Sequence, residues 1–480
     1  MPSARLLLLL AAAAAAATLV VGVLADTPAV QAATFAQQLD HFDARERSTW
    51  TQHYMKAGPF PAPGGEAADS SGTGPAVILL GGLEPVSAAD LEQSHALEVA
   101  QQLNGVAFLL EHRFFGNSIP TPDMSLASLR YLSQAQALED VASFIAHLRA
   151  SGQVSADARV VLYGGLHAGS LAAWARLKYP HLVHAAVASS APVRARAAYT
   201  EWMDVDMRVL ERRGGSKCRR DVREAVAYVD ETLRAAGGNK EVAKLFGLCA
   251  EPDKLDAETL FQRLTDSVTG AVDIQEMDMV QEVCYMFDVA PTARDKAQAL
   301  GSIAGFGMSD EGCENVSYKK GIAAALLEGW GQAVSPYKEQ LTDRLLLFLS
   351  CFEFGQFKAL PAEWLNHYPV EISLQKCSDV FGKAFSRELL EEAILRTNTE
   401  FGAAQPDIRR VVFVYGQDDP YAALGVAEDL TDDHLAPVIE IPEARSCRDM
   451  PMSSAGDTQG VKDAREAIVK YIRQFLSMSP

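Results

Sequence analysis

Short apolar runs that end at glycine or polar residues recur in the first part of the chain. Residues 76–80 (Ala-Val-Ile-Leu-Leu) and 105–110 (Gly-Val-Ala-Phe-Leu-Leu) are almost wholly hydrophobic, and 160–164 and 184–190 repeat the pattern. Apolar runs of this length predict strands buried on both faces of a sheet. Residues 133–150, which lie between these runs, have apolar positions at helical spacing. Strands that alternate with helices predict a parallel sheet covered on both sides.

The pattern changes in the middle of the chain. From about 196 to 386 strands are hard to find and helical periodicity dominates. The strand signal then returns and is followed by a last helical segment, at 410–416, 437–442 and about 461–475. We therefore predict an α/β domain built from residues 26–195 and 387–480, interrupted by a helical cap domain over 196–386.

The first 25 residues have the pattern of a secretory signal peptide. Arg5 precedes a run of leucine, alanine and valine up to Leu24, and a cleavage site follows Ala25. The run is also long enough for an uncleaved anchor, although the small residues before a polar segment favour cleavage. No other segment reaches the ~18 apolar residues of a second span. We expect a protein of the secretory pathway, extracellular or lysosomal, with no membrane span after cleavage.

The charge of the chain limits its partners. The formal net charge is -19, and no stripe of lysine and arginine offsets it. This balance argues against a nucleic-acid partner. The charge does not decide the oligomeric state, which stays open.

If the protein is exported, we expect most of its seven cysteines to form disulfides, because oxidising compartments favour them. Six of them fall in the predicted cap, at Cys218, Cys249, Cys284, Cys313, Cys351 and Cys377. Sequential pairing (218–249, 284–313 and 351–377) is one of several connectivities that the sequence allows. The spacing does not match the ligands of a zinc site, so we expect neither a metal nor a cofactor. Asn315-Val316-Ser317 is a glycosylation sequon.

One segment has the pattern of a hydrolase active-site turn, but it lacks the residue that the catalytic activity requires. Residues 160–174 have the pattern of a strand, a glycine turn and a helix. This is the layout of the nucleophile elbow, in which G-x-S-x-G exposes a serine hydroxyl above the sheet. Leu166 occupies the serine position, and no other G-x-S-x-G occurs in the chain. An isobutyl group cannot attack a carbonyl carbon, so the elbow lacks its nucleophile.

Further motifs follow one another over nearly the whole chain. They lie at 35–42 (Phe-Ala-Gln-Gln-Leu-Asp-His-Phe), 110–118 (Leu-Glu-His-Arg-Phe-Phe-Gly-Asn-Ser), 129–133, 171–181, 351–355 and 377–382. In this order they resemble the serine exopeptidase family of lysosomal Pro-X carboxypeptidase, dipeptidyl peptidase II and thymus-specific serine protease, and the thymus-specific branch most closely. The resemblance implies an α/β-hydrolase fold with a large helical cap stapled by disulfides, and proteolysis as the family's activity.

The resemblance also assigns the positions of the catalytic triad. The family's elbow reads Gly-Gly-Ser-Tyr-(Gly/Pro)-Gly, which places Leu166 at the nucleophile and His167 at the tyrosine. Residues 416–421 (Gly-Gln-Asp-Asp-Pro-Tyr) resemble the motif of the triad acid, which maps onto Asp419. The motif of the base is Ser-His-Cys-x-Asp-Met in this branch, whereas residues 445–450 are Arg-Ser-Cys-Arg-Asp-Met. Ser446 therefore stands at the base position.

Backbone donors of an oxyanion hole can be predicted as well. The N–H of His167 is one candidate, and the turn at Gly82 and Leu83 provides the second. We expect the turn at Leu166 either to relax or to place an apolar plug in the pocket, because a strained apex benefits only a serine.

Two functional readings follow, and a third is related to the first. The first is a secreted, catalytically dead homologue that binds peptides or a protein partner. The second is an active serine exopeptidase that uses displaced residues, namely His167, Ser170 or His434. A purely structural glycoprotein would differ from the first only in lacking a usable pocket. Loss of the nucleophile or base of a triad costs on the order of 10⁶ in rate, which favours the inactive homologue.

Overall fold

The computed structural model describes residues 29–60, 74–273, 279–307, 312–330, 339–361, 367 and 369–479. The predicted signal peptide therefore lies outside the described residues. Within the described part of the chain, no helix combines the length and the apolar character needed to cross a bilayer.

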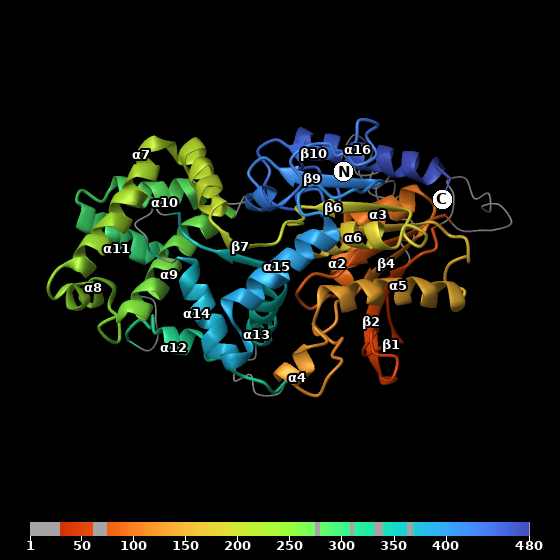
Figure 1. Cartoon of the computed structure of the whole chain (residues 1–480). Coiled ribbons are helices and arrows are strands. Elements are labelled where there is room, and N and C mark those ends of the chain that lie inside the picture. Colours follow the sequence, from red (N-terminus) through yellow and green to blue (C-terminus); the bar gives the residue numbers. More distant parts are fainter. Residues whose placement is uncertain are drawn as a thin grey trace, which may run out of the picture.

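Eight strands form one sheet in the order β1-β2-β4-β3-β5-β6-β9-β10 (Figure 1). β2 pairs antiparallel with both of its neighbours, and all other neighbours pair in parallel. This is the α/β-hydrolase fold that the sequence predicted. The strands are β1 (Gln31–Gln38), β2 (Thr49–Ala57), β3 (Ala76–Leu80), β4 (Val106–Leu110), β5 (Val160–Gly165), β6 (Ala185–Ser189), β9 (Val411–Gly416) and β10 (Val438–Ile441).

Helices cover both faces of the sheet because its central strands are apolar on both sides. On β5, Leu162 packs into the core under α5 (Gln134–Ala150) and α6 (His167–Lys178). The next residue, Tyr163, packs into the opposite core under α3 (His95–Gln102) and α16 (Gln459–Ser477). Side chains along a strand alternate between the two faces, so a continuous apolar run supplies both cores. The short α2 (Ala88–Glu92) and α4 (Leu126–Leu129) lie in the connections.

A helical insertion separates β6 from β9 and lies beside the sheet domain (Figure 1). Its large apolar core includes the fully buried Trp202, Phe261 and Phe287. The helices are α7 (Glu201–Arg234), α8 (Gly238–Phe246), α9 (Lys254–Asp273), α10 (Met279–Asp288), α11 (Ala293–Ile303), α12 (Tyr318–Gly321), α13 (Glu339–Leu349), α14 (Val370–Phe381) and α15 (Arg387–Phe401).

The insertion also contains a feature that its helical pattern hid. β7 (Arg196–Tyr199) and β8 (Gly355–Lys358) form a separate two-stranded parallel sheet. These strands are four residues long and have no marked apolar run, so periodicity could not reveal them.

Three disulfides staple the cap, but two of them differ from sequential pairing. Cys218 pairs with Cys284 and Cys249 with Cys313, in place of 218–249 and 284–313, while Cys351 pairs with Cys377. The cause is tertiary packing, which brings distant segments together. The backbone N–H of Cys249 donates to the carbonyl oxygen of Glu314 at 2.9 Å, and this contact places the cysteine beside Cys313.

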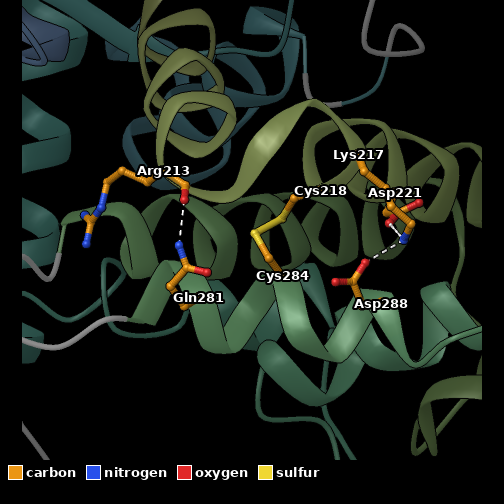
Figure 2. The surroundings of a disulfide bond; sticks show 7 residues. All are labelled: Arg213, Lys217, Cys218, Asp221, Gln281, Cys284 and Asp288. Carbon is orange, nitrogen blue, oxygen red and sulfur yellow. Dashed lines mark hydrogen bonds and ion pairs between the residues drawn. A yellow bond between two sulfur atoms is a disulfide. The ribbon is translucent and has the colours of Figure 1, made fainter.

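The bond between Cys218 and Cys284 joins α7 to α10, as Figure 2 shows. Polar contacts between the same two helices flank it. Gln281 donates to the carbonyl oxygen of Arg213 at 2.6 Å, and Lys217 pairs with Asp288 at 2.7 Å. The pairing of these cysteines therefore follows from the packing of two helices that are far apart in sequence.

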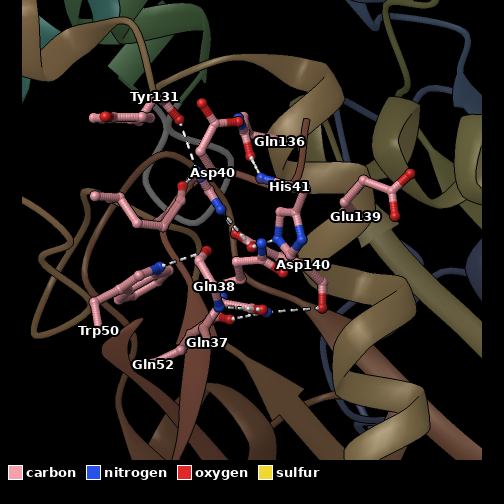
Figure 3. Close-up of polar contacts among 12 residues, drawn as sticks. Gln37, Gln38, Asp40, His41, Trp50, Gln52, Tyr131, Gln136, Glu139 and Asp140 are labelled. Atoms are coloured by element: carbon pink, nitrogen blue, oxygen red, sulfur yellow. Dashed lines mark hydrogen bonds and ion pairs between the residues drawn. The ribbon is translucent and has the colours of Figure 1, made fainter. Parts of the chain in front are cut away.

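Two of the family-like motifs meet at a buried ion pair on α5. Arg113 donates to both carboxylate oxygens of Asp140, at 2.6 and 2.5 Å, and His41 contacts the same carboxylate at 2.8 Å. Gln37 on β1 donates to the backbone oxygen of Asp140 at 3.2 Å (Figure 3). A buried, bidentate pair of this kind fixes geometry. These residues hold the first strand and the loop after β4 on helix α5.

Candidate functional site

The elbow keeps the backbone geometry of a nucleophile turn although its apex is leucine. β5 ends at Gly165, α6 begins at His167, and Leu166 between them has φ 52° and ψ -124°. The N–H of Leu166 donates to the carbonyl oxygen of Ser189 at 2.9 Å, which ties the apex to β6. A Cβ at Gly164 would lie 2.1 Å from the carbonyl oxygen of Ala168, so glycine is required for the strand and helix to approach.

The expected relaxation of this turn is wrong. The positive φ of Leu166 is a conformation that costs a non-glycine residue about 1–3 kcal/mol. The hydrogen bond to β6 and the close approach at Gly164 impose it whatever side chain the apex carries. The Leu166 side chain is 37% exposed, and its role as an apolar plug in the pocket stays a prediction. The elbow thus presents an apolar group at the place where a nucleophile would be exposed.

Asp419, the predicted triad acid, is buried and bonded to Ser446, which stands at the predicted base position. Asp419 follows β9 and caps the 3₁₀ helix Pro420–Leu424. Its Oδ1 accepts hydrogen bonds from the Tyr421 N–H at 2.9 Å and from the Ser446 hydroxyl at 2.6 Å. Its Oδ2 is buried and has no hydrogen-bond partner among the described residues. Burial raises the pKa of Asp419, and the hydrogen bond from Ser446 opposes that rise.

The loop around Ser446 is anchored by polar residues that sequence reasoning missed. The Cys447 N–H donates to the Ser190 hydroxyl at 2.8 Å, and the Ser189 hydroxyl donates to Asp449 at 2.5 Å. Two serines at the end of a predicted buried strand were the available signal. Burial raises the pKa of Asp449 to about 6 and that of Cys447 to about 12. The thiol is therefore protonated and is no replacement nucleophile.

Comparison with known proteins agrees with this geometry. Residues 37–468 match the family model of serine carboxypeptidase S28. The chain belongs to the S28 serine carboxypeptidase family. Thymus-specific serine protease of Mus musculus is 30% identical over 92% of this chain and 86% of its own length. A putative serine protease of Caenorhabditis elegans (K12H4.7) is 29% identical, over 93% and 88%. Lysosomal Pro-X carboxypeptidase of Bos taurus is 24% identical, over 79% and 76%.

Solved structures resemble this S28 family member only distantly. Proline iminopeptidase of Mycobacterium smegmatis has a TM-score of 0.35 and 13% identity, and covers 92% of this chain and 98% of its own. The peroxisomal α/β-hydrolase Lpx1 of Saccharomyces cerevisiae has a TM-score of 0.38 and 12% identity, over 94% and 90%.

The displaced residues of the alternative reading do not assemble into a second triad in this S28 family member. Ser170 is 1% exposed within α6, one turn behind the apex. His434 lies in an exposed loop, where its ring contacts Asp429 at 2.7 Å. His167 is half-buried between the rings of His112 and Phe354. Burial lowers the pKa of His167 to about 3, which makes its imidazole a weak base.

The predicted oxyanion donors lie at two turns that both follow strands. Gly82 follows β3, and a Cβ at this position would have no atom within 4 Å, so the turn borders open space. Leu83, the next residue, is half-buried. The N–H of His167 belongs to the first turn of α6, where backbone donors have no partner within the helix. A role for these three groups as oxyanion donors stays a prediction.

The cap is tied directly to the loop that carries the acid. Arg445 donates to Asp206 of α7 at 2.6 Å and to the carbonyl oxygen of Asp418 at 2.9 Å. Arg212, also of α7, pairs with the carboxylate of Asp418. The position of α7 therefore fixes the backbone next to Asp419, and a movement of the cap would move the acid.

Metal-ligating side chains do not gather at this edge. In the described ranges no group of three or more His, Cys, Asp or Glu residues could hold a metal ion.

Proposed function

We propose that this S28 family member is a catalytically inactive pseudopeptidase that binds a peptide or a protein partner at the edge of the sheet where its relatives act. The observation that carries the proposal is the leucine at the apex of an intact elbow. Leu166 occupies the strained position where a nucleophile would be exposed, and Ser446 bonds to Asp419 in place of a base. A serine hydroxyl cannot accept a proton near neutral pH, so Asp419 has no imidazole to orient.

The size of the expected loss in catalytic rate favours an inactive protein over an active peptidase. Loss of the nucleophile or base costs on the order of 10⁶ in rate, and loss of both costs little more, because they act as a unit. An oxyanion hole and binding alone leave about 10³–10⁴ over the uncatalysed reaction. That remainder is too small for the turnover of a peptide in a cell.

Two features at this edge of the sheet support the proposed binding of a peptide or protein partner. The turn at Gly82 after β3 borders open space, and Leu166 exposes apolar surface at the end of β5, the neighbouring parallel strand. Apolar surface together with free backbone donors would suit an extended peptide, whose own backbone needs polar partners. The disulfides and the lysosomal relatives support a place in the secretory pathway.

Reversion of the two lost triad positions tests the proposal. Wild type, Leu166→Ser, Ser446→His and the double variant are assayed on a peptide with proline before its last residue. We expect no turnover from wild type or either single variant, and measurable turnover from the double variant. Asp419→Asn in the double-variant background is the matched control and should abolish the gained activity. Turnover by the wild type would overturn the proposal, and a folded but inert double variant would favour a purely structural protein.

A further inference from the structure

A concave pocket lies on the opposite side of the sheet from α6, between α3 and α16. Its volume is about 470 Å³, which lies within the range of small-molecule sites. α16 contributes most of the lining, and His95, the first residue of α3, lies at its inner end. None of the elbow and triad positions lines this pocket.

The lining is cationic, in contrast to a chain whose net charge is -19. Lys462, Arg465, Lys470 and Arg473 line it, against the single carboxylate of Glu466. The three exposed cations lie at positions 462, 470 and 473 of α16, a spacing that places them along one side of the helix. An acidic protein that collects positive charge in a hollow concentrates an attractive field for anions there.

Two of these ammonium groups are available to a ligand. The ammonium groups of Lys462 and Lys470 have no hydrogen-bond or ion-pair partner in the described part of the chain. Arg473 has one long contact, from its guanidinium to the carbonyl oxygen of Gln102 at 3.5 Å, and no carboxylate partner is described for it. Glu466, one helical turn from both lysines, offsets one of these charges, and the lining keeps a net positive charge that acts on whatever enters the pocket.

Buried, hydrogen-bonded side chains form the floor of the pocket. Arg465 is 4% exposed and donates to the carbonyl oxygens of Asp449 at 3.1 Å and of Arg448 at 3.3 Å, and it pairs with Asp457. His95 is 1% exposed, and its ring contacts the Tyr163 hydroxyl at 3.3 Å. Because these side chains are buried and hydrogen-bonded, ordering them costs little free energy when a ligand binds.

We propose that this pocket binds the phosphate or sulfate group of a small ligand. Such a group carries up to two negative charges and three acceptor oxygens, which match the ammonium groups of Lys462 and Lys470 and the guanidinium of Arg473. The pocket is a half-open hollow of about 470 Å³, which has room for one charged group on a compact ligand, while the negative charge of the rest of the chain repels a polyanion. The proposal is independent of the peptide site at the elbow, because it uses none of the same residues.

Calorimetric titration of the full secreted chain with inorganic phosphate and inorganic sulfate, at two salt concentrations, tests the proposal. We expect binding that weakens as salt rises. Lys462→Glu with Lys470→Glu should weaken it about tenfold or more, the loss expected for one charge-assisted contact. Lys240→Glu on α8, an exposed lysine outside the pocket, is the matched control and should bind as wild type does.

The same titration with a sugar phosphate and with a sulfated disaccharide then shows which class of ligand the pocket prefers, because the preferred class binds with the lower Kd. Unchanged binding by the double variant, or equal loss in Lys240→Glu, would overturn the proposal, as would the absence of any phosphate or sulfate binding. Leu166→Ser should leave this binding unchanged, so failure here and failure of the peptide site are told apart.

Discussion

The hydroxyl of Ser446 lies 2.6 Å from Oδ1 of Asp419 and donates a hydrogen bond to it. A buried carboxylate left without a partner costs far more than one that keeps its hydrogen bonds. Serine at the base position therefore satisfies one oxygen of the acid without restoring a base. Under the proposed loss of the base, this hydrogen bond explains how the fold tolerates a buried aspartate that has no imidazole beside it.

Removal of that hydroxyl should destabilise the fold. In Ser446→Ala, the Tyr421 N–H remains on Oδ1 while the buried carboxylate loses the Ser446 hydroxyl as a donor. We expect a loss of about 1–3 kcal/mol in the free energy of unfolding, measured by urea denaturation at pH 7. Ser302→Ala, an exposed helical serine, is the control and should change stability by no more than about 0.5 kcal/mol. Equal losses in the free energy of unfolding for the two substitutions would show that the hydrogen bond to Asp419 does not stabilise the fold.

The apex of the elbow should be more stable as glycine than as leucine. Leu166→Gly removes the Cβ that makes φ 52° costly, a strain of about 1–3 kcal/mol, but adds about 0.5–1 kcal/mol of chain entropy. We expect a net gain near 1 kcal/mol in thermal or urea unfolding. Leu166→Ala keeps the Cβ and should show no such gain. A glycine variant less stable than the alanine variant would argue that the turn is not strained.

Chemical mapping can check the cap's disulfides. Peptide mapping without reduction should link the peptide of Cys218 to that of Cys284, and Cys249 to Cys313. Loss of the first bond in Cys218→Ala with Cys284→Ala opens a loop of 66 residues. The chain-entropy model gives that loop about 4 kcal/mol, which should appear as cap-specific protease sensitivity. A peptide linking Cys218 to Cys249 would contradict the packing of α7 against α10.

A half-buried histidine should make the stability of the cap depend on pH. The two ring nitrogens of His367 contact Asp230 of α7 at 2.5 Å and Glu258 of α9 at 3.3 Å. Burial opposes the charged imidazolium, but Glu258 and Asp230 together outweigh burial and raise the pKa of His367. Its contribution to stability is therefore full below the unfolded pKa of about 6.5 and is lost as pH rises through the higher folded pKa.

His367→Gln tests this dependence. The difference in unfolding temperature between wild type and His367→Gln should be larger at pH 5 than at pH 9, because only the imidazolium can donate to both carboxylates at once. Taking the difference between the two proteins removes the effect of other titrating groups, such as the buried Asp449. A difference that stays constant from pH 5 to 9, or grows with pH, would contradict this role.

The sequence predicted those parts of the fold that depend on local patterns. The apolar runs at 76–80 and 410–416 became β3 and β9, because a strand buried on both faces has a distinctive composition. The pairing of Cys218 with Cys284 depends on how two helices pack, which no local pattern encodes. The geometry at Leu166 was missed for the same reason, since β6 and Gly164 impose it from outside the turn.

In the candidate site too, local motifs could be predicted from the sequence and tertiary contacts could not. The candidate positions Leu166, Asp419 and Ser446 were predicted from motifs, whereas the contacts between their loops were not. Arg445 connects Asp206 of the cap to the backbone of Asp418, across more than two hundred residues of sequence. Contacts of this kind depend on the assembled fold, so they become visible only when both domains are in place.

Labelling of the purified wild-type protein with a fluorophosphonate probe, at acidic and at neutral pH, tests the central claim most directly. The probe reacts only with a serine activated by a base, and the site of labelling is then located by mass spectrometry. With Leu166 at the apex and Ser446 beside Asp419, we predict that no serine is labelled at either pH, while the double variant Leu166→Ser with Ser446→His is labelled at the elbow. Stoichiometric labelling of one defined serine of the wild type, such as Ser170, would contradict the account.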